Sequence, residues 1–365
     1  MKRYRVGIIG ATGMVGQRFL SLLDSHPWFD VCVLAASKRS AGKTYREAVG
    51  DHWAFSWPIP PRFADMKVWD ASDPGQFTDA VDFVFCAVNL PRDEVRVLEE
   101  HLAGCEIPVI SNNSACRGIP DVPMIIPELN ADHARVIESQ RKRLHTRKGF
   151  IAVKPNCSIQ SYVPALTPLL PFGLKKISVC TYQAISGAGK TFSTWPEMED
   201  NVIPFISGED EKSEKEPLKI WGHVVEDGGL LHIENAPEPV ISAQCLRVAC
   251  SDGHMAAVSV SFDRKPEKAE ILDRWNHFQT LPQKLGLPSA PDPFLQYFED
   301  PSRPQTRLDR DFGNGYGVSI GRLREDSILD WKFVCLSHNT IRGAAGGGIL
   351  SAELLCSLGY IDAKG

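Results

Sequence analysis

A glycine-rich turn between a strand-like run and a helix-like run constrains this sequence more than any other feature. Residues 5–9 are mostly apolar, as in a buried strand, and apolar side chains recur at helical spacing over residues 14–23. Gly10, Gly13 and Gly16 mark the junction. Such a turn lets backbone N–H groups approach a phosphate where the helix dipole favours negative charge. Because the spacing is GxxGxxG rather than GxGxxG, an ordinary tight turn stays open as the alternative.

The first 155 residues alternate short apolar runs with amphipathic stretches. Besides residues 5–9, the runs at 31–36, 81–88 and 108–111 read as buried strands. Strand–helix alternation with nearly continuous apolar strands is typical of a parallel sheet covered on both faces. The sequence therefore predicts a Rossmann-type, doubly wound α/β domain.

After residue 150 the pattern changes. The runs at 177–184, 246–250 and 255–262 are longer, rich in β-branched residues and partly alternating, which favours an antiparallel or mixed sheet. Residues 197–216 are acidic and read as a loop and helix, whereas residues 282–307 contain six prolines and read as a long excursion. A glycine-started helix is expected over residues 343–358. We therefore expect a second domain of the α+β class with a mixed sheet.

Composition narrows the class of protein. The 365 residues are about twice the size of a usual single domain. Forty basic and 45 acidic residues give a formal charge of -5, which argues against nucleic acid or an anionic membrane as the main partner. No apolar run approaches the ~20 residues of a membrane span. The ten cysteines form no CxxC or zinc-finger pattern, so we expect free thiols in the cytoplasm and no metal site.

The end of the second predicted strand indicates which dinucleotide is preferred. NAD-binding folds place a carboxylate there to hold the ribose hydroxyls. Here Ser37, Lys38 and Arg39 follow the strand, with no acidic residue among them. Their charge suits a 2′-phosphate and favours NADP, and the alternative is a pair of solvated cations.

Cys157 follows Asn156 and precedes a stretch that looks helical. A cysteine at a helix N-terminus has its thiolate stabilised by the dipole, and the free backbone amides there can form an oxyanion hole. A lone cysteine is more often structural. The sequence therefore makes Cys157 a candidate nucleophile that needs a partner.

A strand-like run carrying Arg247 ends at His254, which could act as general base and then general acid beside a thiol. A lone histidine at such a junction is otherwise a structural residue. Residues 182–191 form a second glycine-rich turn. It is not a phosphate-binding P-loop, because Ala184 stands where that motif requires glycine.

In their order along the chain, these segments resemble the aspartate-semialdehyde dehydrogenases, in the branch typical of archaea and fungi. The resemblance covers nearly the whole chain, at residues 10–16, 34–43, 111–117, 154–160, 182–190, 209–219, 247–254 and 337–345. It implies an NADPH-dependent conversion of L-4-aspartyl phosphate to aspartate 4-semialdehyde with release of phosphate. That reaction serves the biosynthesis of lysine, threonine, methionine and isoleucine.

The resemblance also implies roles for particular residues. Cys157 matches the nucleophile that forms an acyl thioester, His254 the acid-base residue, and Gln183 the residue that orients the acyl group. Arg247 matches the clamp on the substrate carboxylate and Glu209 the partner of its ammonium, although three acids beside Lys212 leave that register open. The substrate-binding set implied is Arg247, Glu209, Lys212, Arg117 and Asn156, with Arg117 and Lys212 on the phosphate.

The cofactor would contact both glycine-rich turns and the residue before the last helix. The implied cofactor-binding set is Gly10, Thr12, Gly13, Met14, Val15, Ser37, Lys38, Arg39, Ser186, Gly187, Gly189 and Asn339. The domains implied are 1–154, completed by a C-terminal helix within 340–365, and a catalytic and dimerisation domain at 155–339. A homodimer or homotetramer is expected.

Three other functions remain open. A malonyl-CoA reductase would share the thiol, the histidine and NADP, but it would have no ammonium for Glu209 to hold. A non-catalytic NADP-binding regulator would not need Cys157 and His254 together. Cysteine hydrolase chemistry would leave the first glycine-rich turn without a purpose.

Overall fold

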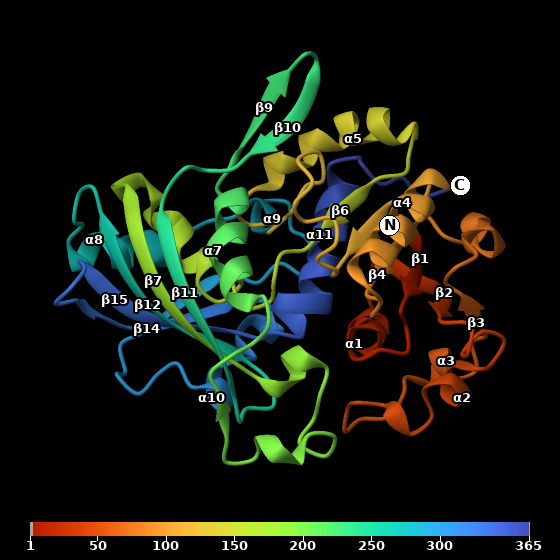
Figure 1. Ribbon diagram of the computed structural model, residues 1–365, viewed down its shortest axis with the longest axis horizontal. Helices are drawn as coiled ribbons and strands as arrows, with labels where there is room; N and C mark the ends of the chain where they lie inside the picture. Colours follow the sequence, from red (N-terminus) through yellow and green to blue (C-terminus); the bar gives the residue numbers. More distant parts are fainter. Residues whose placement is uncertain (1–2, 365) are drawn as a thin grey trace.

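The computed structural model describes residues 3–364, and its first sheet contains six strands in the order β3-β2-β1-β4-β5-β6. Every neighbouring pair in this sheet is parallel, which confirms the doubly wound prediction (Figure 1). The strands are β1 (Tyr4–Ile9), β2 (Phe29–Ala36), β3 (Val68–Asp70), β4 (Phe83–Cys86), β5 (Val109–Ser111) and β6 (Ile151–Val153). The helices are α1 (Met14–Leu23), α2 (Tyr45–Val49), α3 (Pro61–Ala64), α4 (Arg92–Gly104) and α5 (Ile137–Leu144).

Two of the three glycines in the first turn are required by close packing. Gly10 has a φ of 88°, and a Cβ there would lie 2.4 Å from the carbonyl oxygen of Ala87. A Cβ on Gly16 would lie 2.3 Å from the carbonyl oxygen of Gly10. These glycines let α1 lie directly on the turn, with Gly13 as the N-cap residue.

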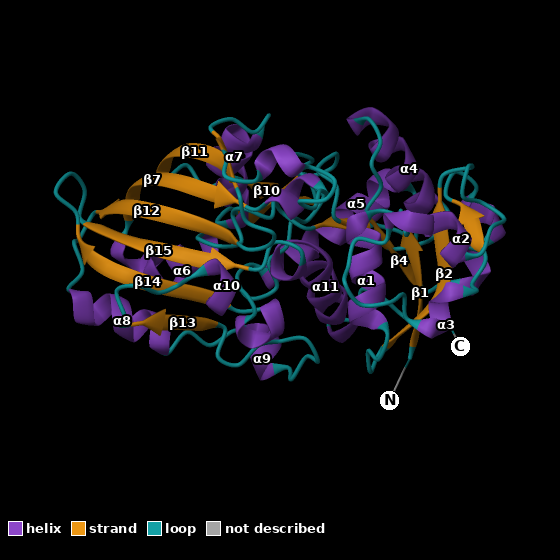
Figure 2. Cartoon of the chain, turned by 90° about the horizontal axis from the view of Figure 1, so that it is seen from below, coloured by secondary structure: helices purple, strands orange, loops and turns teal. Residues whose placement is uncertain are grey.

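The second sheet has seven strands in the order β13-β14-β15-β12-β7-β11-β8 (Figure 2). The β7–β11 and β13–β14 pairs are parallel and the others are antiparallel, so the predicted mixed sheet is confirmed. The strands are β7 (Leu174–Gln183), β8 (Val202–Ile203), β11 (Val240–Val248), β12 (His254–Phe262), β13 (Leu295–Phe298), β14 (Val318–Glu325) and β15 (Trp331–Ser337).

Side chains on β7 and β12 alternate between buried and more exposed positions, so one face of this sheet is covered and the other is open. The covered face packs in one hydrophobic cluster with side chains such as Tyr162, Ile220 and Trp275. The helices of this half are α6 (Val163–Leu166), α7 (Glu209–Ile220), α8 (Lys268–Asn276), α9 (Leu281–Lys284) and α10 (Thr306–Asp309).

The proline-rich stretch at 282–307 is more ordered than the sequence suggested. It contributes the edge strand β13, which pairs in parallel with β14, because its prolines lie outside the four residues that pair. A separate hairpin of β9 (His223–Asp227) and β10 (Leu230–Glu234) extends beside α5 (Figure 1).

The chain returns to the first sheet at its C-terminal end. The predicted helix at 343–358 begins later, as α11 (Gly346–Ser357), because residues 341–345 form a π-helical turn, η9 (Ile341–Ala345). Ala344 in that turn has a φ of -141° and a ψ of -107°, outside the helical region. Helix α11 contacts α1 and β5 and is almost wholly buried (Figure 1). No helix within residues 3–364 is long and apolar enough to cross a bilayer.

A buried ion pair holds the C-terminal segment where it returns to the first sheet. Arg342 donates to both carboxylate oxygens of Glu128, at 2.5 and 2.7 Å, and its Nε donates to Gln160 at 3.1 Å. Both side chains of the pair are fully buried. The bond therefore joins the loop after β5, the turn after β6 and the C-terminal segment.

We predict that Glu128→Gln lowers the free energy of unfolding by about 3–5 kcal/mol, because it leaves a buried guanidinium without its counter-ion. Urea unfolding followed by tryptophan fluorescence measures the loss. Glu100→Gln is the control: it breaks partly exposed pairs with Arg96 and Arg143 and should cost at most about 1 kcal/mol. Equal small losses in both variants would contradict the prediction.

Candidate active site

Cys157 and His254 form a pair where the two sheets meet. Cys157 lies in the turn after β6, and His254 is the first residue of β12. The sulfur is 3.4 Å from Nε2 of His254. The structure thus brings the two sequence candidates together from segments 97 residues apart.

The expected helix N-terminus at Cys157 is wrong. Helix α6 begins only at Val163, and residues 157–162 form turns. Oδ1 of Asn156 accepts from both the N–H and the hydroxyl of Ser158, each at 2.7 Å, in a local turn. Pro164, in the first turn of α6, has no N–H to donate to the carbonyl of residue 160, so a regular helix cannot run from Cys157 through it. The thiol therefore lacks the support of a regular helix dipole.

Neighbouring cations supply part of that support, although the pKa of the thiol stays above its ordinary value. Burial raises the pKa of the Cys157 thiol, and the nearby carboxylate of Glu209 raises it further. Lys154, Arg117 and Arg247 act in the opposite direction. Formation of a thiolate here depends on those three charges.

The imidazole of His254 is held in one tautomer. Its Nδ1 accepts a hydrogen bond from the backbone N–H of Ala184 at 3.0 Å, so the neutral ring carries its proton on Nε2, facing the sulfur. Burial lowers the pKa of His254 well below its ordinary value, and Arg247 lowers it further. At neutral pH the ring is an uncharged donor directed at Cys157.

Glu209, the first residue of α7, is the carboxylate that enters the site. It accepts from Asn156 Nδ2 at 2.9 and 3.0 Å, from Gln183 Nε2 at 3.1 Å and from Lys212 Nζ at 2.8 Å. Burial alone would raise the pKa of Glu209, but these partners together lower it. Asp210 instead accepts from the backbone of Cys245, and Glu211 is exposed, so Glu209 is the one of these three acids that faces the thiol.

Two arginines flank the sulfur. Arg247 on β11 pairs in register with Gln183 on β7, and its Nη1 donates to the carbonyl of Ala184 at 2.7 Å. Arg117 donates to Glu216 at 2.8 Å. Glu216 also accepts from the backbone N–H of Asn156 at 2.6 Å, and so links the arginine to the nucleophile turn. The sequence analysis missed Glu216, since nothing in its spacing marks it among the acids of α7.

The second glycine-rich turn leaves space beside the histidine. A Cβ on Gly187 would lie 2.8 Å from Arg247 Nη1 and 3.0 Å from His254 Nε2. Asn339 links this turn to β12: its Oδ1 accepts from Gly253 N–H at 2.8 Å, and its Nδ2 donates to Ser186 at 2.9 Å. The amide predicted to contact the cofactor is thus held by the protein at both ends.

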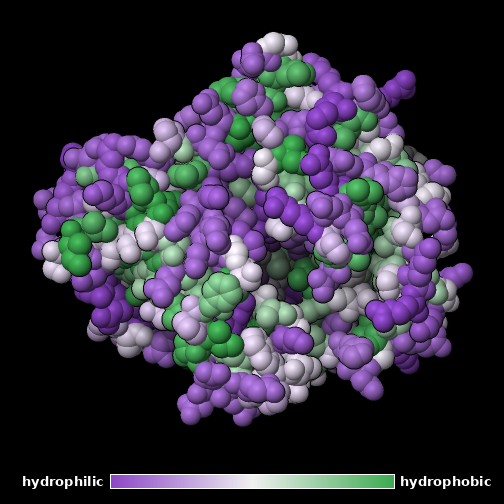
Figure 3. Space-filling model, viewed as in Figure 1, coloured by the Kyte–Doolittle hydropathy of each residue, from purple (hydrophilic) through white to green (hydrophobic). Residues whose placement is uncertain are grey.

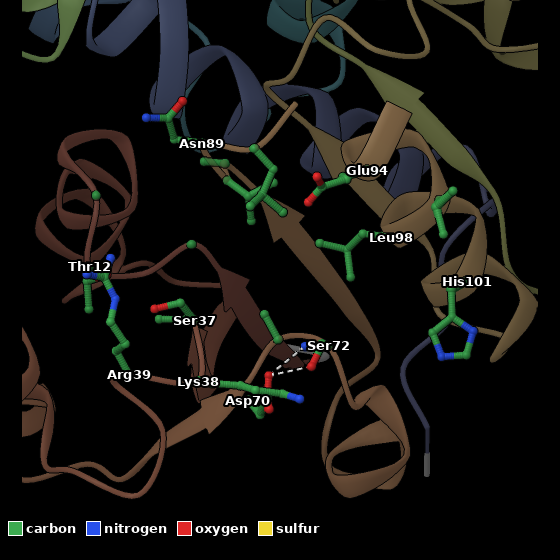
Figure 4. A pocket seen from close by; sticks show the side chains of 18 of the residues that line it. Thr12, Ser37, Lys38, Arg39, Asp70, Ser72, Asn89, Glu94, Leu98 and His101 are labelled. Carbon is green, nitrogen blue, oxygen red and sulfur yellow. Dashed lines mark hydrogen bonds between the residues drawn. The ribbon is translucent and has the colours of Figure 1, made fainter. Parts of the chain in front are cut away.

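A cavity of about 910 Å³ opens at the first glycine-rich turn (Figure 4). It is lined by six of the predicted cofactor residues, namely Gly10, Thr12, Gly13, Ser37, Lys38 and Arg39. Met14 and Gly189 line a neighbouring cavity of about 600 Å³ instead, and Val15 lines neither. The surface is hollowed near the centre of the face in Figure 3.

Asp70 and Ser72 also line the larger cavity, and the sequence analysis missed both (Figure 4). Strand β3 is too short to give a periodic signal, yet its pairing with β2 places Asp70 opposite Ala36. Oδ1 of Asp70 already accepts from the N–H and the hydroxyl of Ser72, at 2.9 and 2.7 Å. Lys38 and Arg39 are the cations of this cavity, and they fit a phosphorylated ribose.

Together, a parallel sheet with a nucleotide-sized cavity and a partly buried thiol–imidazole pair are typical of a dinucleotide-dependent oxidoreductase. Residues 5–137 match the family described as semialdehyde dehydrogenase, NAD binding domain, and residues 166–342 match its dimerisation domain. The chain belongs to the aspartate-semialdehyde dehydrogenase family. The relatives and solved structures that support this are similar over nearly their full length.

One such relative is the aspartate-semialdehyde dehydrogenase of Archaeoglobus fulgidus, 43% identical over 97% of this chain and 98% of its own. That of Schizosaccharomyces pombe is 42% identical over 98% of this chain and 99% of its own. The crystal structure of the Candida albicans enzyme with NADP has a TM-score of 0.88 and 39% identity, over 99% of this chain and all of that one. These matches agree with the archaeal and fungal branch expected from the motifs.

Proposed function

We propose that this protein catalyses the NADPH-dependent reductive dephosphorylation of L-4-aspartyl phosphate to L-aspartate 4-semialdehyde. The reaction is reversible and needs phosphate in the oxidative direction. The observation that carries this proposal is the Cys157–His254 pair at 3.4 Å, set among one carboxylate and several cations. Its place is the aspartate pathway to lysine, threonine, methionine and isoleucine, which the family relatives support.

In the first half of the reaction, the sulfur of Cys157 attacks the acyl carbon. A C–S bond forms, the C–O bond to phosphate breaks, and phosphate leaves with the bonding electrons. Arg117 and Lys212 would hold the departing phosphate, because both are cations within the shell around the site. The product of this half is a thioester on Cys157.

For the second half, the residues that line the 910 Å³ cavity would hold NADPH, which when bound would supply a hydride to the thioester carbon. The Nε2–H of His254 would donate a hydrogen bond to the oxygen that becomes negative on the Cys157 adduct. When that oxygen re-forms the C=O bond, the C–S bond breaks, the sulfur leaves as the thiolate and the aldehyde is released. Gly187 lies against His254, and Asn339 donates to Ser186 in the same turn, which supports their assignment to the cofactor.

The carboxylate and the ammonium of the substrate need protein partners of opposite charge. Arg247 suits the carboxylate because a guanidinium can donate two parallel hydrogen bonds. Glu209 suits the ammonium, since Asn156 and Gln183 already orient its oxygens. A malonyl-CoA reductase would have no use for this carboxylate, and a non-catalytic regulator would have no use for the thiol–imidazole pair.

The test is absorbance at the nicotinamide band with aspartate 4-semialdehyde, NADP and phosphate. We expect phosphate-dependent reduction of NADP, and a loss of at least about a thousandfold in Cys157→Ser with NADP binding retained. Cys250→Ser is the control, because that thiol lies outside the pair. Turnover of malonyl-CoA instead, or undiminished activity of Cys157→Ser, would reject the proposal.

Cofactor preference follows from Lys38 and Arg39. We predict that Lys38→Ala and Arg39→Ala each raise the KM for NADP about tenfold or more and change the KM for NAD little, because a charge-assisted bond to the 2′-phosphate is lost. Lys43→Ala, which removes an exposed lysine outside the cavity, is the control. Equal changes for both dinucleotides would show that these side chains do not contact the 2′-phosphate.

We infer the domain division stated above, 1–154 with the C-terminal helix and 155–339; residues 1, 2 and 365 lie outside the described chain. The two separate sheets support it. A cytoplasmic location is proposed from the ten cysteines, all free thiols.

We further propose that two copies associate through the open face of the second sheet, where Tyr182, Leu246, Met255 and Val334 present apolar atoms.

We therefore expect light scattering to give two or four times the chain mass of 40.4 kDa. Ser178→Arg places a long cation at the middle of that face, opposite Ser242 and Ser259, and should yield single chains. Gln76→Arg, at an exposed position of the first half, should leave the mass unchanged. A wild-type mass of one chain would contradict the proposed association.

A further inference from the structure

Glu216, on α7, touches both sides of the proposed phosphate site. Its side chain is mostly buried. Oε1 accepts from Nη1 of Arg117 at 2.8 Å, and Oε2 accepts from the backbone N–H of Asn156 at 2.6 Å. These contacts reach segments 99 and 60 residues away along the chain. A single carboxylate therefore sets the distance between the cation assigned to phosphate and the turn that carries the nucleophile.

Charged side chains recur on one face of α7. Glu209, Lys212, Glu216 and Lys219 follow one another at helical spacing, so they leave the helix on the same side. The first two pair with each other at 2.8 Å. Lys219 instead donates to the backbone carbonyl of Arg117 at 2.7 Å. Helix α7 therefore holds this arginine at its main chain as well as at its guanidinium.

The same helix supports the turn that contains the nucleophile. Pro217 has no N–H to donate to the carbonyl of Ser213, four residues earlier in α7. The hydroxyl of Tyr162 donates to that carbonyl instead, at 2.8 Å. Residues 157–162 form turns rather than a helix of their own. The position of Cys157 therefore depends on α7 as well as on its own segment.

Arg117 is oriented at two of its nitrogens. Nη1 donates to Glu216, and Nη2 donates to the carbonyl of Asn112 at 3.2 Å. Its Nε has no partner among the described residues. Because a guanidinium carries five N–H donors, donors remain for an anion after these two contacts have set its plane. Without Glu216, the contact with Asn112 alone would hold the guanidinium.

We propose that Glu216 is a positioning residue that acts through Arg117, holding its guanidinium where a phosphate can bind beside the sulfur of Cys157. This role rests on the proposed function, in which Arg117 holds the phosphate. Charge and position predict opposite results when the carboxylate is removed. Loss of a negative charge alone would tighten phosphate binding, whereas a displaced guanidinium would weaken it. Because a misplacement of about 1 Å can cost about a hundredfold, we expect position to dominate.

The experiment measures how inorganic phosphate protects Cys157 from iodoacetamide, at fixed pH and ionic strength, with the labelled peptide quantified by mass spectrometry. It compares wild type with Glu216→Gln, which keeps the size of the side chain but not its charge. Glu216→Asp keeps the charge but is too short to reach both donors. Glu214→Gln is the matched control, because this second carboxylate of α7 accepts from the backbone N–H of Ala243, outside the site.

We expect both Glu216 variants to raise the half-protecting phosphate concentration about tenfold or more. Glu214→Gln should keep the wild-type value. The affinity for NADPH, followed by its fluorescence, should be the same in all of these proteins, because Glu216 does not line the nucleotide cavity. A lower or unchanged phosphate concentration in folded Glu216→Gln, or an equal rise in the control, would overturn the proposal. If Glu216→Gln does not fold, Glu216→Asp decides.

The protection assay also separates this role of Glu216 from the proposed function. Wild-type protein that phosphate does not protect would reject the phosphate site itself, and the role of Glu216 with it. Equal protection of wild type and Glu216→Gln would reject the role of Glu216 alone. In the catalytic assay, Glu216→Gln should raise the KM for phosphate by a similar factor and leave the KM for NADP unchanged, which a general loosening of the fold would not do.

Discussion

The buried ion pair between Arg342 and Glu128 determines where the two halves of the molecule meet. It joins the loop after β5 to the returning chain, and Gln160 ties the turn after β6 to the same guanidinium. Because the loss of either partner leaves an uncompensated buried charge, this junction tolerates little change. It places Gly343 against Cys157 and Gly347 against Lys154, so the surroundings of the thiol depend on a contact between distant segments.

The spacing of apolar residues and glycines predicted the elements that depend on neighbours close in the sequence. The bounds of α1 match the helical spacing of its apolar residues, and glycines at 10 and 16 are where α1 packs on its turn. Strand β3 was missed because three residues carry no period, although its pairing with β2 brings Asp70 into the nucleotide cavity. The start of α11 was predicted too early because a π-helical turn precedes it. Arg342 in that turn is paired with Glu128, a residue far away in the sequence, so short-range spacing does not reveal the turn.

Some residues of the candidate site were likewise indicated by the sequence, and others were found only in the structure. Family resemblance indicated Cys157, His254 and Glu209, and the structure places them in one shell. The expectation of a helix N-terminus at Cys157 was wrong because Pro164, which has no N–H to donate, can stand only in the first turn of a regular helix, and α6 therefore begins at Val163. Glu216 was not found from the sequence, since its significance comes from contacts with Arg117 and with the Asn156 backbone, across 99 and 60 residues.

Charge explains why one pocket suits both halves of the proposed reaction. Arg117, Arg247 and Lys154 favour negative charge on the sulfur before attack. Once the sulfur carries an acyl group it has no charge, and those cations lose their partner just as the leaving phosphate gains negative charge. In the proposed assignment Arg117 would then support the leaving phosphate together with Lys212, while Arg247 stays with the substrate carboxylate. A preformed cation would thus favour the nucleophile first and the leaving group second, which is the form of preorganisation that lowers a barrier.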